Sequence, residues 1–176
     1  MGSEMCIRDR VKPMPDSVYQ EALVGNSYIP PAGYSETWYT WSNREWGTKW
    51  DAISTKIDPK NHEINFETAW FSPHPVIQKL HEMTGIGLHV LYADEDKGYN
   101  LGGYIYERGI TPANLPEEGS LEAVNLSCLI QYGKCAKDYY GQDYAESYTD
   151  FYPQSPQLEE TYDPWERYHL TPKEEA

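Results

Sequence analysis

Alternating apolar and polar residues predict a β-hairpin in the first half of the chain. Residues 51–58 alternate between two faces, and residues 63–71 alternate with Ile64 and Phe66 on the same face. The residues between them, Pro59-Lys60-Asn61-His62, have the composition of a turn. We therefore expect two antiparallel strands that this turn connects.

A second hairpin is predicted further along the chain. Its strands are expected at residues 88–92 and 99–106, and the acidic turn Asp94-Glu95-Asp96-Lys97-Gly98 joins them. The pair Gly102-Gly103 within the second strand is more typical of a β-bulge than of a ligand contact, so we expect a bulge there.

Helical spacing predicts a helix before each hairpin. Trp38, Trp41 and Trp46 recur at this spacing, and Gly47 can end a helix with a positive φ angle. Between the hairpins, Ser72 is the expected N-cap and Pro73 the first helical residue, where its missing N–H costs nothing. The buried stripe of this second helix is expected at Val76, Ile77, Leu80 and Met83, before a stop at Gly85.

A third helix is predicted after a linker at residues 112–119. Ser120 is its expected N-cap. Its expected face includes Leu121, Val124, Cys128, Leu129 and Tyr132.

The order helix, hairpin, helix, hairpin predicts an α+β fold with a ferredoxin-like antiparallel sheet and helices on one face. We expect this domain at residues 11–109. An acidic, Tyr-rich and mainly helical C-terminal extension follows at residues 110–176. Residues 1–10 are interpreted as a leader that is not native, because residues 5–10 look like a translated sequencing adaptor of the kind that contaminates metagenomic assemblies.

Composition and charge narrow the classes of function. The chain has 176 residues, of which 39% are hydrophobic and 24% charged, as is typical of a globular protein. Acidic residues outnumber basic ones by 28 to 14, which gives a net charge of −14. Binding to a nucleic-acid backbone or to an anionic membrane needs a basic surface, so both are disfavoured. No apolar run approaches the roughly 20 residues of a membrane span.

The three cysteines are Cys6, Cys128 and Cys135, and they form no CxxC pair. An odd number without such a pair argues against a disulfide framework and favours a reducing compartment, so we expect a cytoplasmic protein of a host cell. Cys128 and Cys135 lie seven residues apart, which predicts that both are buried on one helical face.

The sequence has no pattern typical of catalysis or cofactor binding. Its five histidines are scattered and form no HExxH motif. The turn at residues 94–98 is similar to a calcium loop, but its Gly is fifth rather than sixth, which favours a solvated turn. A phosphate-binding glycine loop and a nucleophile elbow are both missing from the sequence. We therefore expect no enzyme activity, no cofactor and no metal site.

The C-terminal segment has the most unusual composition. Residues 138–176 contain ten acidic residues, two basic residues and nine aromatic residues, and a tyrosine recurs every fourth residue from Tyr140 to Tyr152. One interpretation is a helix whose tyrosines pack on the sheet. Another is that its carboxylates imitate nucleic-acid phosphates in a basic groove, with tyrosines as anchors. The candidate partner-binding residues are Asp138, Asp143, Glu146, Asp150, Glu159, Glu160 and Asp163.

Two motifs carry a resemblance to a known family. They are Trp46-Gly47-Thr48-Lys49-Trp50-Asp51 and Phe66-Glu67-Thr68-Ala69-Trp70-Phe71-Ser72-Pro73. Over residues 39–109 the chain resembles the YubB-like ferredoxin-domain family, small accessory proteins of phages and conjugative plasmids. The first strand usual in that family, opened by a Trp-Cys-Asn-like run, is absent here. The resemblance implies a mobile-element origin and a fold, but no reaction, and within the motifs Trp46, Trp50 and Trp70 are interpreted as packing residues.

These observations predict a non-enzymatic binding protein of a phage or plasmid. We expect it to inhibit a host nucleic-acid-handling defence complex as an anti-CRISPR-like acidic decoy. Its partner is expected to be a host protein with a basic groove, such as a CRISPR effector nuclease, with no direct nucleic-acid or membrane contact. The alternatives are a protein that sequesters a nucleotide signal, as phage anti-defence sponges do, and an uncharacterised small enzyme.

Overall fold

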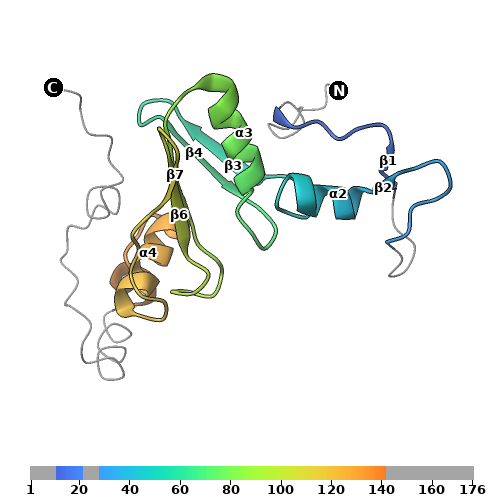
Figure 1. Cartoon of the computed structure of the whole chain (residues 1–176). Coiled ribbons are helices and arrows are strands. Elements are labelled where there is room, and N and C mark those ends of the chain that lie inside the picture. Colours follow the sequence, from blue (N-terminus) through green and yellow to red (C-terminus); the bar gives the residue numbers. More distant parts are fainter. Residues whose placement is uncertain (1–10, 22–27, 142–176) are drawn as a thin grey trace. The chain divides into compact units, whose positions relative to one another are not determined.

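The computed structural model of the chain describes residues 11–21 and 28–141 (Figure 1). The chain divides into two compact units, residues 1–85 and residues 86–176, which we call the N-terminal unit and the C-terminal unit. No helix in the described ranges is long and apolar enough to cross a membrane.

The N-terminal unit is built around tryptophan side chains. Its first two strands, β1 (Val18–Tyr19) and β2 (Glu36–Thr37), pair in parallel, and helix α2 (Trp38–Glu45) follows directly. The core of the unit consists of Val18, Trp41, Trp46 and Val76. Gly47 follows the end of α2 with a φ of 76°. The helix predicted from the tryptophan spacing is therefore confirmed.

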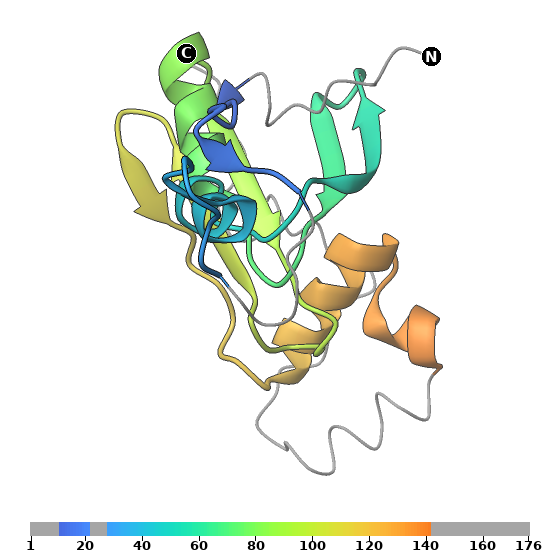
Figure 2. The ribbon, with the colours of Figure 1, turned by 90° about the vertical axis from the view of Figure 1, so that its right-hand side faces the viewer.

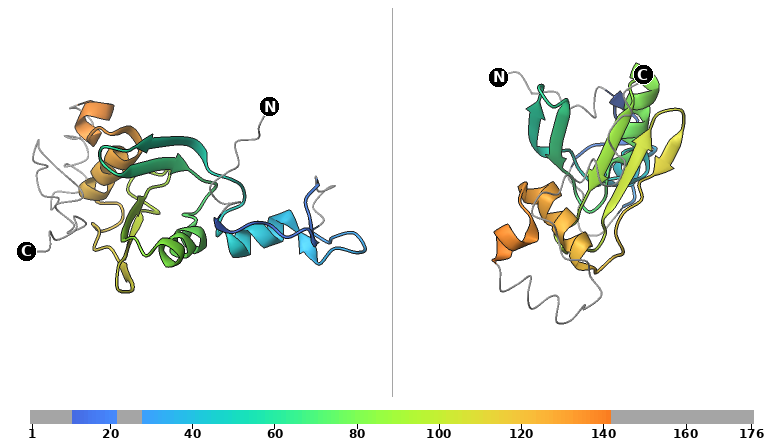
Figure 3. Two further views of the ribbon diagram at one scale, coloured as in Figure 1. Left: turned by 90° about the horizontal axis from the view of Figure 1, so that it is seen from above. Right: turned by 90° about the vertical axis from the view of Figure 1, so that its left-hand side faces the viewer.

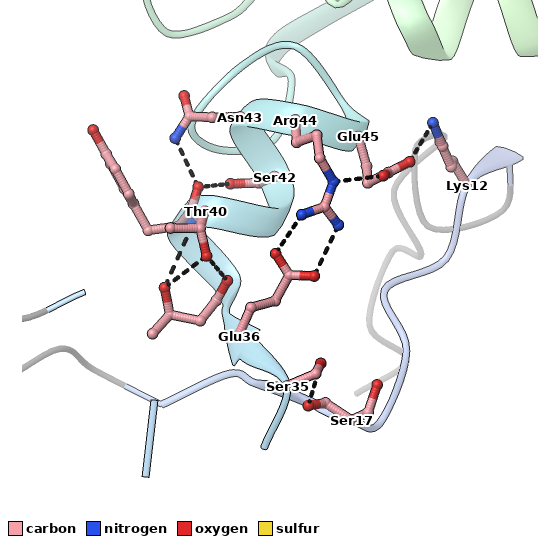
Figure 4. A network of polar contacts seen from close by, with 11 residues as sticks. Lys12, Ser17, Ser35, Glu36, Thr40, Ser42, Asn43, Arg44 and Glu45 are labelled. Atoms are coloured by element: carbon pink, nitrogen blue, oxygen red, sulfur yellow. Dashed lines mark hydrogen bonds and ion pairs between the residues drawn. The ribbon is translucent and has the colours of Figure 1, made fainter. Parts of the chain in front are cut away.

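An ion-pair network fixes the end of α2 to the segments before it (Figure 4). The two terminal nitrogens of Arg44 donate hydrogen bonds of 2.7 and 2.8 Å to the two carboxylate oxygens of Glu36. Arg44 Nε also donates to Glu45, 2.8 Å away, and Lys12 pairs with the other oxygen of Glu45 at 2.7 Å. Arg44 thus bridges β2 and the last residue of its own helix.

The first predicted hairpin is confirmed. Strands β3 (Ile53–Asp58) and β4 (Glu63–Glu67) pair antiparallel, with a register shift in the first half of β3. The hairpin forms a two-stranded sheet, which can be followed in Figure 3. Ile57 lies opposite Ile64, and both side chains are exposed. Strand β4 ends at Glu67 rather than continuing to Phe71, because a tight turn follows it.

Helix α3 (His74–Thr84) begins one residue later than expected. Pro73 rather than Ser72 is the N-cap, and no side chain caps the helix. Gly85 ends it in the left-handed conformation, and its N–H donates to the carbonyl of His81. Of the expected buried stripe, Val76 is buried, whereas Met83 is exposed. The middle of the stripe, Ile77 and Leu80, is half-buried.

The C-terminal unit contains one antiparallel sheet in the order β5-β6-β7. Its strands are β5 (Leu88–Tyr92), β6 (Gly102–Tyr106) and β7 (Ile110–Pro112). The second predicted hairpin is confirmed, but the predicted bulge at Gly102-Gly103 is wrong, because these residues pair in regular register with Tyr92 and Leu91. A side chain on Gly103 would lie 2.8 Å from the carbonyl oxygen of Val90, so close approach of the backbone is the reason for glycine.

Helix α4 (Leu121–Tyr132) contacts β5, and the short helix α5 (Ala136–Tyr140) follows it. Figure 2 shows α4 and α5 as consecutive helices joined by a short turn. Ser120 is the N-cap of α4, as predicted, and its hydroxyl accepts a hydrogen bond from the N–H of Ala123. The helix is buried almost all round rather than on one face. Its buried residues are Leu121, Ala123, Val124, Asn125, Leu126, Ser127 and Cys128.

The two described cysteines do not share a helical face. Cys128 lies within α4 and is fully buried, whereas Cys135 is the half-buried N-cap of α5. The chain turns at Gly133, with a φ of 65°, so helical spacing is interrupted between them. Burial raises the pKa of the Cys128 thiol above its usual value.

Candidate functional site

One predicted partner-binding residue, Asp138, lies within the described part of the chain. It is an exposed residue of α5. The other six predicted residues fall at positions 143–163, outside the described residues. Tyr140, the first of the expected tyrosine stripe, also lies on α5, and the rest of that stripe is outside the described residues.

Three exposed tyrosines lie at the end of α4 and on α5, the helix that carries Asp138, and we call Tyr132, Tyr139 and Tyr140 the tyrosine surface. The rings of Tyr132 and Tyr139 stack with centroids 4.0 Å apart and an angle of 2° between their planes. Tyr140 meets Tyr139 edge to face, with 4.9 Å between centroids. Their exposed fractions are 41%, 44% and 41% in chain order. Preformed aromatic groups of this kind present a rigid, largely apolar area to a partner.

A buried hydrogen bond positions this surface. The side-chain oxygen of Asn125 on α4 accepts a 2.8 Å hydrogen bond from the backbone N–H of Ala136, the first residue of α5. Both residues are buried, so loss of this acceptor would leave an N–H unsatisfied away from water. The bond therefore fixes the start of α5, and with it the position from which Tyr139 stacks on Tyr132.

Lys97 adds a positive charge next to the Tyr132 ring. Its ammonium lies 5.0 Å from the ring centroid of Tyr132 and donates to the side-chain oxygen of Gln131. It also donates to the carbonyl of Glu95, while the Gln131 amide donates to the carbonyl of Asp94. The turn at residues 94–98, expected to be simply solvated, is instead bonded to the end of α4.

Hydrogen bonding makes the two stacked phenols different. The hydrogen bond from Tyr139 lowers the pKa of Tyr132 below its usual value near 10, and the Lys97 ammonium lowers it further. The same hydrogen bond raises the pKa of Tyr139. Burial raises the pKa of the Cys135 thiol, and its hydrogen bond to the Asp138 carboxylate raises that pKa further.

A second cluster lies in the N-terminal unit, where the two sequence motifs meet. The ammonium of Lys49 lies 4.6 Å from the ring centroid of Trp50, 5.0 Å from that of Trp70 and 5.7 Å from that of Tyr39. We call these four residues the tryptophan–lysine cluster. The prediction that the motif tryptophans are packing residues is confirmed for Trp46, which is 7% exposed. It is wrong for Trp50 and Trp70, which are 47% and 57% exposed.

Hydrogen bonds from side chains to the backbone connect the first motif to the second motif and to α2. The hydroxyl of Thr48 donates to the carbonyl of Ala69 at 2.9 Å, and the hydroxyl of Ser42 on α2 donates to the carbonyl of Lys49 at 2.8 Å. Gly47 lies against Pro75, where a Cβ atom would be 2.7 Å from the proline ring. These contacts fix the loop that carries Lys49 and Trp50.

Trp70 adopts an unusual backbone conformation. Its φ of 66° lies in the left-handed region, which bulky residues rarely adopt and which costs about 1–3 kcal/mol. The turn is held because the N–H of Phe71 donates to Ala69 and the hydroxyl of Thr68 donates to the carbonyl of Phe71, both at 2.8 Å. The strained turn directs the indole outward rather than into the core.

The described ranges, residues 11–21 and 28–141, contain no group of three or more His, Cys, Asp or Glu side chains that could hold a metal ion.

The turn at residues 94–98, which is similar to a calcium loop in sequence, has a hydrogen bond within the protein. The Asp94 carboxylate accepts a 2.7 Å hydrogen bond from the side chain of Asn100. This bond is the main reason why the pKa of Asp94 lies below its usual value.

A model for the ferredoxin-like domain in Api92-like protein matches residues 45–134, just over half of the chain. The chain belongs to this family. The match confirms the ferredoxin-like α+β class predicted from the order of elements. The Api92-like ferredoxin domain includes the tryptophan–lysine cluster except Tyr39, and it includes Tyr132 but not Asp138, Tyr139 or Tyr140. No curated protein and no solved structure matches the chain.

Sequence reasoning missed most of both clusters. It placed Tyr132 on the buried face of a helix, and it did not predict that Tyr139 returns to stack on it. The signal was present as Gly133, a residue able to end α4 and reverse the chain. For the tryptophan–lysine cluster, the signal was a lysine between two motif tryptophans, but the exposure of Trp50 and Trp70 depends on the turn after Glu67.

Proposed function

We propose that this protein is a non-enzymatic binding protein that inhibits a host nucleic-acid-handling defence complex as an acidic decoy, in the manner of an anti-CRISPR protein. It is encoded by a phage or plasmid and acts in the cytoplasm of the host cell. Support for the mobile-element origin comes from the resemblance to the YubB-like family over residues 39–109. The single observation that supports the binding function is the exposed, prestacked tyrosine surface on α4 and α5.

The composition of the chain favours a positively charged partner. A net charge of −14 accelerates the approach to a basic groove and opposes the approach to nucleic acid or to an anionic membrane. Charge alone gives little affinity, because exposed ion pairs are weak. The tyrosine surface supplies binding affinity, since rigid tyrosines lose little conformational entropy when a partner covers them. We therefore assign steering to the carboxylates and anchoring to the tyrosines.

The test uses the full chain and a panel of purified CRISPR effector nucleases loaded with guide RNA. We expect the chain to inhibit target-DNA cleavage by a member of the panel and to compete with DNA for its basic groove. Replacement of Tyr139 by Ala removes the stacked ring and should weaken binding by about tenfold or more, as for a central anchor. Asp138→Asn should weaken binding by about twofold to fivefold, as expected for an exposed charge.

Two matched variants serve as controls. Tyr34 is as exposed as Tyr139, at 44%, but lies in the N-terminal unit, and Asp16 is an exposed carboxylate in the same unit. Tyr34→Ala and Asp16→Asn should leave inhibition unchanged. Equal losses at Tyr34 and Tyr139, or failure to bind every effector in the panel, would contradict the proposal.

A further inference from the structure

We propose that the tryptophan–lysine cluster of the N-terminal unit is a binding site for a free mononucleotide. In this site the base stacks on the exposed indole of Trp50 or Trp70, and the phosphate pairs with the ammonium of Lys49. The inference is independent of the proposed function, because it concerns different residues in the other unit.

The first support is the exposure of two indoles that the fold could have buried. The same unit buries Trp41 and Trp46 in its core, where they meet edge to face. Trp50 and Trp70 instead lie about half in water, with ring centroids 6.3 Å apart. Exposed aromatic faces held by a rigid scaffold are the feature on which nucleic-acid bases stack, and stacking tolerates any base.

The second support is the backbone of Trp70. A left-handed φ of 66° is unfavourable for this residue, and glycine would adopt it without strain. Burial does not compensate for the strain, because the Trp70 side chain is more than half exposed. A tryptophan that is strained and also left in water is better explained by a role in binding than by a role in the core.

The third support is the environment of Lys49. Among the described residues Lys12 and Lys79 pair with glutamates at 2.7 and 3.7 Å. The described residues supply no carboxylate partner for the Lys49 ammonium, which three aromatic rings hold in place. In a chain with twice as many acidic as basic residues, such an ammonium is available to an external anion. Its place beside the indoles suits an anion that is attached to a stacked ring.

The charge of the chain selects a small ligand over a polymer. A nucleic-acid strand brings many phosphates toward a protein of net charge −14, whereas a mononucleotide brings one phosphate to one lysine. A carbohydrate could also cover an exposed indole, but it would leave Lys49 unused. The shared chemistry of the ligand is therefore a planar base that carries a single phosphate group, linear or cyclic.

The experiment measures binding to the full chain by isothermal calorimetry and by quenching of tryptophan fluorescence. The probes are AMP, GMP and cyclic AMP, with adenosine lacking the phosphate and ribose 5-phosphate lacking the base. We expect the nucleotides to bind at least fivefold more tightly than adenosine, and ribose 5-phosphate to bind too weakly to measure. Lys49→Met should reduce nucleotide binding to the level of adenosine without changing adenosine binding.

Trp70→Gly separates a binding role from a structural one. Glycine accepts the left-handed conformation, so this variant removes the indole and relieves the backbone strain together. We expect nucleotide affinity to fall at least tenfold while the melting temperature stays the same or rises. Lys56→Met, at an exposed lysine of the β3–β4 hairpin, is the matched control and should bind as the unaltered chain does.

Three results would overturn the inference. They are no nucleotide binding at millimolar concentration, equal affinity for AMP and adenosine, and unchanged nucleotide binding after Trp70→Gly. Tighter binding of a single-stranded oligonucleotide than of a mononucleotide would instead indicate a nucleic-acid surface. A melting temperature lowered by Trp70→Gly with unchanged affinity would make Trp70 a structural residue.

Discussion

At the scale of single residues, the C-terminal unit contains a position where only glycine fits without rearrangement. A Cβ atom on Gly103 would lie 2.8 Å from the carbonyl oxygen of Val90, 2.9 Å from the side chain of Leu91 and 3.0 Å from the Cβ of Ala113. The first of these contacts is with the backbone of the paired strand, which cannot move without disturbing the ladder. Space, rather than a special backbone angle, is therefore what requires glycine in β6.

We predict that Gly103→Ala destabilises the protein by about 1–3 kcal/mol, the usual cost of overpacking. Gly109 is the matched control, because nothing lies within 4 Å of a Cβ added there. Gly109→Ala should change the free energy of unfolding by less than about 0.5 kcal/mol. Urea unfolding of both variants, followed by circular dichroism, measures the difference. If the two substitutions cost the same, the crowding at β6 is not real.

At the scale of elements, the end of α2 depends on charge. Hydrogen bonds from Arg44 lower the pKa of Glu36, and hydrogen bonds from Lys12 and then Arg44 lower the pKa of Glu45. A carboxyl group whose pKa is lower in the folded state stabilises the fold above its unfolded pKa, which is about 4.3 for glutamate. That contribution is lost as the pH falls through the lower folded pKa. The network in Figure 4 therefore stabilises the fold at neutral pH, and this stabilisation is lost in acid.

We predict that Arg44→Gln lowers the melting temperature at pH 7 and has a progressively smaller effect as the pH falls below about 4. The reason is that protonated Glu36 and Glu45 have no charge for Arg44 to neutralise. Melting curves at several pH values, followed by circular dichroism, give the comparison. Lys79→Gln is the control, since the Lys79–Glu82 pair is exposed and longer, at 3.7 Å, and it should have little effect at any pH. A pH-independent loss for Arg44→Gln would mean that its packing rather than its charge matters.

The elements that the sequence predicts correctly are those that local chemistry determines. Ser120 caps α4 through its own side chain, and Gly85 ends α3 through its own φ angle, so neighbouring residues suffice to predict both. The bulge prediction failed because the reason for Gly103 lies on another strand. Pro73 rather than Ser72 is the N-cap of α3. The turn before this helix includes Ala69, whose carbonyl accepts a hydrogen bond from Thr48, 21 residues earlier. Long-range contacts are the part that a single sequence does not reveal.

At the scale of the whole molecule, some features of the candidate sites follow from the sequence alone, whereas others depend on the tertiary structure. The negative charge follows from composition and could be predicted, as could the presence of tyrosines near Asp138. Which aromatic faces remain in water could not be predicted, because Trp46 and Trp50 belong to one motif and only the tertiary structure buries the first and exposes the second. Charge and aromatic exposure therefore have different origins, and they should also contribute separately to binding.

This separation leads to a kinetic prediction for the proposed complex with a basic partner. Charge acts over distance, so raising the salt concentration from about 20 to about 200 mM should lower the association rate constant tenfold or more. The dissociation rate constant should change by less than about twofold, because it depends on groups already in contact. Tyr139→Ala should show the reverse, with faster dissociation and unchanged association. Surface plasmon resonance with the effector that the chain inhibits resolves the two rate constants. Were salt to act only on dissociation, the carboxylates would be contact residues, and steering by a charge of −14 would have no part in recognition.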